Sequence, residues 1–266
     1  MNPILLILAV VPGLLICYLI YRADRYEREP KLLMLASFIF GCLITYPTMK
    51  VEAIADTLGW EQSTNFFKLF FFSVVFVGLV EEFFKFFCLI ALPYFRKSFN
   101  EPLDGIVYAV FIAMGFATVE NLIYASSYDI QTIALRGLTA VPAHASFAVV
   151  MGYFVGLAKL DEKQRIKYFF LALVIPALIH GLYDFFILQT YYDWLISFAS
   201  LVLIVSLYFA YKLTLKHLKT STLKSEERAA AALALASAEQ AALIEPENSN
   251  QDMIDEIFQQ MRKEEE

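Results

Sequence analysis

The chain has 266 residues, of which 59% are hydrophobic, and phenylalanine alone occurs 25 times. Apolar runs of about 20 residues recur along it, which is typical of a polytopic membrane protein and excludes a soluble globular domain. The net charge of -6 arises at the C-terminus: residues 1–220 contain 17 Lys and Arg against 16 Asp and Glu, and residues 221–266 contain 4 against 11. We therefore expect the lipid bilayer as a partner, and no nucleic acid.

The apolar runs predict an all-α, polytopic transmembrane helical bundle. Seven spans with short connections are expected, at residues 3–21, 32–49, 66–92, 105–125, 136–158, 168–188 and 194–213. The first run lacks the basic region and the small-residue cleavage site of a signal peptide, so we expect it to be retained as a span. Residues 1–215 are therefore predicted to form one membrane-embedded unit.

Lysine and arginine predict the orientation of the bundle, because positive charge accumulates on the cytoplasmic side of a membrane. The seven-span scheme places most basic residues on one side, namely Arg22, Arg25, Arg28, Lys31, Arg96, Lys97, Lys159, Lys163, Arg165, Lys167, Lys212, Lys216 and Lys219. Only Lys50, Lys68 and Arg136 are on the other side. We therefore expect the N-terminus outside and the C-terminus in the cytoplasm.

Residues 216–266 are predicted to form a short, acidic cytoplasmic tail that is partly helical or disordered. Its alanine-rich part, Arg228 to Leu243, is helix-prone, and Glu245 to Gln251 has the composition of a polar linker. The last apolar residues fall on one face of a short helix: Met253, Ile254, Ile257, Phe258 and Met261. That face would suit a partner protein, while a solvated, loosely ordered tail is the simpler alternative.

Titratable side chains interrupt four of the predicted spans. They are Glu81, Glu82, Lys85, Glu120, His144, His180 and Asp184. Ionised groups at membrane depth are costly unless they face a partner or a watery cavity, so they indicate a functional site. Counted from the cytoplasmic ends at about 1.5 Å per residue, four of them lie roughly 16 to 22 Å deep. We expect one shared polar layer, although a structural ion pair or a packed histidine would explain each residue taken singly.

The spacing of these residues along the helices favours acid–base chemistry. Glu81 and Lys85 are four residues apart, and Glu82 can also reach Lys85 at three, so one lysine can neutralise one of two adjacent carboxylates. The other carboxylate is then available as a general base. His180 and Asp184 are again four residues apart, a spacing that lets the carboxylate orient the imidazole.

Together the motifs resemble those of a known family. Glu81 to Lys85 fits EExxK, Phe116 to Asn121 fits FxxxEN, His144 is the isolated histidine of the next span, and His180 to Asp184 fits HxxxD. In this order, on four predicted helices, they resemble the PrsW-type intramembrane proteases. That family is distantly related to the CAAX prenyl endopeptidases and the bacteriocin-immunity-type membrane proteases. The resemblance covers about residues 1–215.

The resemblance implies an endopeptidase of the bacterial cytoplasmic membrane that hydrolyses a peptide bond of a membrane-anchored protein. It assigns water activation to Glu81 and the orientation of that water to Glu82. Further catalytic residues are His180, His144 and Glu120, and supporting residues are Lys85, Asn121 and Asp184. Asn121 would donate a hydrogen bond to the oxyanion.

The resemblance leaves the metal open. The prenyl endopeptidase relatives carry histidine at the end of the second motif, where this chain has Glu120. His144, His180 and Glu120 would form a ligand set that suits hydrolytic zinc. A glutamate–histidine water mechanism would need no metal, so both alternatives stand.

Other classes are excluded or disfavoured by motif. The chain has no HExxH, no GxSxG-like serine site and no GxGD, which excludes site-2-type, rhomboid and presenilin-type proteases. A transporter or channel would use the same carboxylates and histidines as an ion path, but we find no internal repeat that would favour it. A scaffold that kept the site and lost activity is the third alternative.

Overall fold

The computed structural model describes residues 2–24, 27–57, 59–60, 63, 65–189, 192–244 and 255–262. These residues group into two units, Met1–Ser221 and Thr222–Glu266. All regular secondary structure in the described ranges is helical, and six helices there are long and apolar enough to cross a membrane. The prediction of an all-α, polytopic membrane protein is thus confirmed.

The helices follow the predicted spans with some differences. The long helices are α1 (Pro3–Ala23), α2 (Lys31–Asp56), α5 (Pro102–Tyr124), α7 (Ala140–Leu160), α8 (Arg165–Leu188) and α9 (Ile196–Ile244), and a short α6 (Ile130–Leu138) precedes α7. Two 3-10 turns, η3 (Glu162–Gln164) and η4 (Asp193–Leu195), precede α8 and α9. Helix α2 continues about two turns beyond the predicted end of its span. Glu52 lies in this extension and is partly buried.

The predicted span 66–92 is helical throughout but is not a single α-helix. It consists of α3 (Phe66–Phe71), η1 (Phe72–Leu79), α4 (Val80–Leu89) and η2 (Ile90–Tyr94), of which η1 and η2 have π-helical turns. Because it is divided into four short segments, it is not among the six helices that are long enough to cross a membrane. Here the structure departs from the seven-span prediction. π-Helical turns occur frequently at functional sites.

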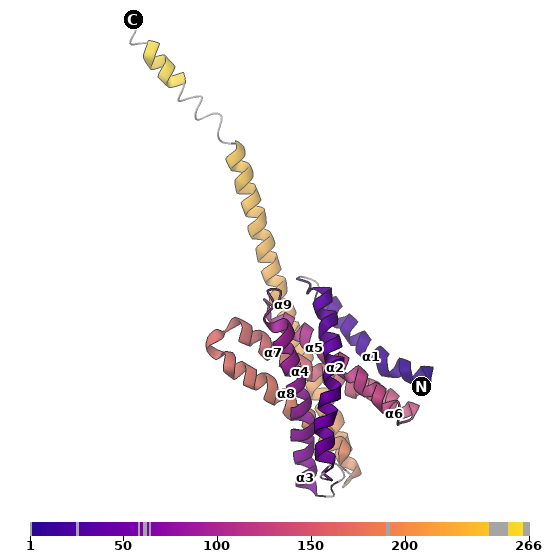
Figure 1. The fold of residues 1–266 in the computed structure, drawn as a ribbon. Coiled ribbons are helices and arrows are strands. Elements are labelled where there is room, and N and C mark those ends of the chain that lie inside the picture. Colours follow the sequence, from indigo (N-terminus) through magenta and orange to yellow (C-terminus); the bar gives the residue numbers. More distant parts are fainter. Residues whose placement is uncertain are drawn as a thin grey trace. The chain divides into compact units, whose positions relative to one another are not determined.

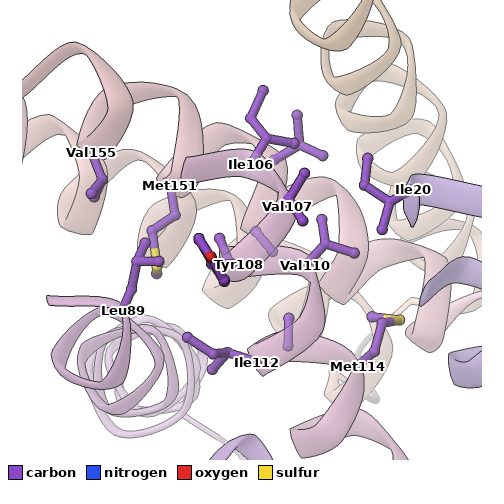
Figure 2. Close-up of a cluster of buried hydrophobic side chains, with 14 of the residues drawn as sticks. Ile20, Leu89, Ile106, Val107, Tyr108, Val110, Ile112, Met114, Met151 and Val155 are labelled. Atoms are coloured by element: carbon purple, nitrogen blue, oxygen red, sulfur yellow. The ribbon is translucent and has the colours of Figure 1, made fainter. Parts of the chain in front are cut away.

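Helix α5 is the centre of the first unit, packing against α1, α2, α4 and α7. Its residues are buried around most of the circumference, including Ile106, Ile112 and Met114. Figure 2 shows these side chains together with Leu89 of α4 and Met151 of α7. Because dense packing fixes the positions of neighbouring helices, this core holds α4, α5 and α7 together.

Two glycines bring the backbones of α5 and α7 into contact. A Cβ atom on Gly105 would lie 2.3 Å from the carbonyl oxygen of Gly152, and one on Gly152 would lie 2.2 Å from that of Gly105. Only glycine fits at such a contact, which is a common way for membrane helices to approach closely. Figure 1 shows the two helices at the centre of the bundle and α6 beside α1, against which it packs.

Three connections meet at one end of this bundle. Asn100 Nδ2 donates to Glu27 Oε1 at 3.0 Å, and Lys159 Nζ donates to the carbonyl oxygen of Tyr94 at 2.7 Å. The first bond joins the segment before α2 to the segment after η2, and the second joins the end of α7 to η2. Many of the basic residues lie in or next to these segments. That arrangement supports the predicted orientation, which stays a prediction; Arg25 lies outside the described residues.

The second unit, Thr222–Glu266, is helical in its described residues. Its helical residues extend to Ile244, as the alanine-rich sequence predicts, and residues 255–262 form another helix. Ile257, Phe258 and Met261 are exposed there. Met253, Ile254 and the predicted linker Glu245 to Gln251 lie outside the described residues. The domain division near residue 215 and a partner for the tail stay predictions.

Candidate active site

The first part of the site is a buried cluster on α4. Lys85 Nζ donates to Glu81 Oε2 at 2.9 Å and to Glu82 Oε1 at 2.8 Å. The exposed fractions of the three residues are 2, 4 and 0% respectively. The expected pairing of one lysine with both glutamates is therefore observed. Because buried charges are tolerated only when they are paired, Lys85 is what allows two adjacent carboxylates to stay inside the bundle.

Helix α8 adds the second part. His180 Nδ1 lies 2.9 Å from Glu82 Oε1, and Nε2 lies 3.1 Å from Asp184 Oδ2. A doubly protonated imidazolium can donate to both carboxylates. The expected contact between His180 and Asp184 is thus present, and the structure adds a direct link from His180 to the paired glutamates.

This link depends on close packing between α8 and η1. A Cβ atom on Gly181 would lie 2.4 Å from the Cα of Val74, and one on Gly78 would lie 2.4 Å from the carbonyl oxygen of Ala177. The two glycines therefore let the backbones touch directly beside His180 and just before Glu81. Any larger residue would push the helices apart and lengthen the bond between His180 and Glu82.

Helices α7 and α5 complete the cluster with His144 and Glu120. Lys85 Nζ donates to His144 Nδ1 at 3.0 Å, and His144 Nε2 lies 3.0 Å from Glu120 Oε2. Since an ammonium group only donates, Nδ1 is the acceptor nitrogen and Nε2 carries the proton that is donated to Glu120. The polar side chains of the four predicted spans therefore meet in one network, as expected from their depths.

Arg136 of α6 belongs to this network, although the sequence suggested only an outward-facing charge. Its guanidinium is 2.7 Å from Glu120 Oε1, its Nε donates to Asn121 Oδ1 at 2.9 Å, and it lies 3.7 Å from the ring centre of Tyr124. Asn121 is buried and does not line the cavity described below. An arginine inside an apolar run of this length was the available signal.

A cavity of about 550 Å³ adjoins the network. Its acidic, basic and histidine lining residues are Glu52, Glu81, Glu120, Arg136, His144, His180 and Asp184. Glu82 and Lys85 lie behind this wall. The lining comes from η1, the start of α4, the end of α2, the end of α5, α6, the start of α7 and the end of α8. The ends of α2, α5 and α8 and the start of α7 are on the side predicted to face outside, so the cavity lies toward that side. Glu52 is the second residue that the motifs missed, because it follows the predicted end of its span.

The residues also form a cage of a size that suits a cation. One oxygen or nitrogen atom from each of Glu81, Glu82, His144 and His180 lies within 4.8 Å of those of the other three, and all four residues are buried. Glu82 Oε2 is buried and receives no hydrogen bond from the described part of the chain. The predicted ligand set was His144, His180 and Glu120, whereas the observed cluster contains Glu81 and Glu82 in place of Glu120. The carboxylate oxygens of Glu120 instead contact Arg136 and the Nε2 atom of His144.

Fold and site together define a membrane-embedded peptidase class, since a buried glutamate–histidine cluster beside a cavity can activate water within a helical bundle. The family model described as PrsW family intramembrane metalloprotease matches residues 29–211. The chain belongs to this family. This membership confirms the predicted family, the predicted class of enzyme and the predicted location in a bacterial membrane. The alternatives of a transporter and an inactive scaffold are not favoured.

Several relatives carry the name Protease PrsW. The protein of Clostridioides difficile (strain 630) is 36% identical over 222 residues, which cover 81% of this chain and 90% of that protein. The protein of Bacillus subtilis (strain 168) is 34% identical over 187 residues, or 70% and 83% of the two chains. No solved structure matches the chain.

Proposed function

We propose that Glu81 is the general base of this membrane endopeptidase. Glu81 lies at the cavity wall, whereas Glu82 is fully buried behind it, so Glu81 is the carboxylate that meets water. In the proposed reaction, Glu81 takes a proton from water as the water oxygen bonds to the peptide carbonyl carbon. The same proton passes to the leaving nitrogen as the carbon–nitrogen bond breaks.

The neighbouring residues have distinct proposed roles. Glu82 holds both Lys85 and His180, and Asp184 orients His180 from its other nitrogen. Glu120 orients His144 in the same manner. His144 and His180 line the cavity, and each would exchange one of its present hydrogen bonds for one to the attacking water or the carbonyl oxygen. The single observation that carries this proposal is the bond of 2.9 Å between His180 and Glu82, which joins two motifs far apart in sequence.

Asn121 receives a different proposed role from the one its motif suggests. Its amide oxygen accepts a hydrogen bond from Arg136, and the residue is absent from the cavity lining. We therefore propose that Asn121 holds Arg136 in place. Arg136 itself lines the cavity, so Arg136 takes the place of Asn121 as the proposed donor for a developing oxyanion.

The residues also fit the metal that the family description implies. Glu82, with its unpaired oxygen, and the two histidines would be the protein ligands, leaving Glu81 as the base. Each imidazole would then give up one of its present hydrogen bonds and offer an unprotonated nitrogen to the ion. Zinc is the proposed ion, because imidazole and carboxylate ligands with an open water position suit it. When bound, it would polarise the scissile carbonyl and activate water. Glu82 thus replaces Glu120 in the ligand set.

We propose a membrane-anchored protein as the substrate, cut on the side of the membrane toward which the cavity lies. The test is co-expression with candidate single-span proteins. Glu81→Gln and Glu82→Gln should each abolish cleavage while leaving membrane insertion and protein amount intact, because the exchange removes a carboxylate at almost constant volume. Glu162→Gln, at an exposed carboxylate, is the matched control. Full turnover by either site variant would overturn its assigned role.

The metal is tested separately by elemental analysis of the purified protein and by activity before and after chelation. We expect zinc at about one ion per chain and loss of activity on its removal. Full activity in metal-free protein would leave the glutamate–histidine mechanism. Lys85 would then supply the positive charge beside both glutamates, and Lys85→Met should be nearly as harmful as Glu81→Gln.

A further inference from the structure

Glu52 of α2 is a cavity residue that the proposed reaction does not use. It lines the cavity together with its helix neighbours Met49 and Ala53. Glu81, Glu120, His180 and Asp184 line the same cavity. Glu52 therefore lies in the space that a bound substrate must enter.

The other acidic residues of the cavity wall already have partners. Glu81 pairs with Lys85, Glu120 pairs with Arg136, and Asp184 lies beside His180. Glu52 Oε1, in contrast, is buried and receives no hydrogen bond from any described residue. Among the acidic residues of the described lining, Glu52 is therefore the one without a cationic partner, because Arg136 already pairs with Glu120.

A buried carboxylate without a donor is costly, and the cost is offset when a cationic or N–H group approaches it. We propose that Glu52 binds a lysine or arginine side chain of the substrate close to the scissile bond and so selects basic sequences. This inference rests on the proposed function, because it takes the cavity to be the substrate site. An acidic substrate residue at the same place would put its carboxylate beside that of Glu52 with no cation to compensate either, so it would be disfavoured.

The surroundings of Glu52 favour a basic side chain that also has an apolar stem. The lining also contains Met49 and Ala53 of α2, and Phe72 and Val77 of η1, a segment that packs against α2. Lysine and arginine bury their methylene groups against such surfaces while the charged end finds a partner. The preferred substrate is therefore a membrane-anchored polypeptide with a basic residue beside its apolar span, near the cut.

The test uses the purified full-length chain in lipid bilayers. The probe is a mixture of synthetic peptides that share one apolar span and differ in a randomised outer flank, and mass spectrometry identifies the products. The wild type should prefer lysine or arginine over glutamine at one fixed position from the cut. Glu52→Gln should reduce this preference about 10-fold, the effect of losing one charged hydrogen bond. Glu52→Lys should shift the preference to acidic residues.

Lys50→Gln is the matched control, because Lys50 lies on the same helix but is exposed and contacts Tyr46. It should keep the selectivity of the wild type. Unchanged selectivity in both Glu52 variants would overturn this inference alone, as would loss of all cleavage in Glu52→Gln, which would assign Glu52 to the chemistry or the fold. If no product depends on Glu81, the proposed function fails as well.

Discussion

Glu81 and Glu82 are neighbours in sequence with different surroundings. Glu81 reaches the cavity wall, whereas Glu82 contacts Lys85 and His180 behind it. The difference arises because adjacent residues of an α-helix point about 100° apart. Glu81 can therefore meet water while Glu82 holds Lys85 and His180 in place. We expect Glu81→Gln to remove the base and Glu82→Gln to disturb the positions of Lys85 and His180.

His180 should be more important than its partner Asp184. His180 contacts the paired glutamates and lines the cavity, whereas Asp184 acts through it. We predict that His180→Ala lowers kcat/KM as far as the loss of Glu81, and that Asp184→Asn lowers it about 10 to 100-fold, which is typical for a residue that orients another. Cleavage of one substrate by both variants measures this. Equal and negligible losses would leave α8 with a structural role.

Arg136 should matter through its contacts with Glu120 and Asn121. We predict that Arg136→Gln lowers kcat about 10 to 100-fold, because Glu120 would no longer be held against His144. Arg136→Lys should restore only part of the activity, since an ammonium group lacks the planar fork of the guanidinium. A changed pH profile of kcat in Arg136→Gln would separate this role from a purely structural one.

The control for Arg136 is another arginine with the same kind of partner. Arg165 contacts Glu162 at 2.7 Å, as Arg136 contacts Glu120, but that pair is largely exposed. Exposed ion pairs contribute little. Arg165→Gln should therefore leave the kinetics unchanged, and equal losses in both variants would show that the cavity pair has no special role.

At the scale of elements, the site depends on how closely η1 and α8 pack. Gly181→Val would place side-chain atoms against Val74 and Ser73, because a Cβ atom at position 181 would lie 2.4 Å from the Cα of Val74 and 2.7 Å from the carbonyl oxygen of Ser73. We predict a loss of kcat of about 100-fold, since displacements of about 1 Å at an active site can cost that much. Overpacking should also lower the free energy of unfolding by about 1–3 kcal/mol.

Kinetics and thermal unfolding of the same preparation measure both effects. Leu178→Phe is the control, because it adds volume to α8 at an exposed position. Activity retained in Gly181→Val would mean that the helices can separate without opening the bond between His180 and Glu82. In that case the close packing would not be what positions the histidine.

At the scale of the whole molecule, the orientation in the membrane decides which side the cavity faces. We predict an N-terminus outside and a C-terminus inside, because basic residues gather at the end that carries the connections before α2 and after α7. Arg136, one of the three exceptions, pairs within the cavity instead of lying in a loop. This strengthens the charge asymmetry.

Reporter fusions measure the orientation. Fusions after Arg28, Lys97, Lys163 and Lys219 should report the cytoplasm, and fusions near Gly59, Asp129 and Tyr191 should report the outside. Tyr191 lies outside the described residues. A reversed pattern would place the cavity on the cytoplasmic side, and the proposed side of cleavage would be wrong.

The sequence by itself determined the class of protein. Hydropathy and the spacing of polar residues along one helix are local properties, so the spans, the contact of Lys85 with both glutamates and that of His180 with Asp184 could be predicted. The four motifs also indicated the family that the comparisons confirm. The roles of the individual site residues stay predictions.

Only the tertiary structure decided which residues of different helices meet. The contacts of His180 with Glu82, of His144 with Lys85 and of Arg136 with Glu120 depend on where glycines let backbones touch and on how far each helix is turned about its axis. Glu52 joined the cavity because α2 continues past the predicted end of its span. Such positions follow from packing between segments distant in the chain, which no local pattern contains.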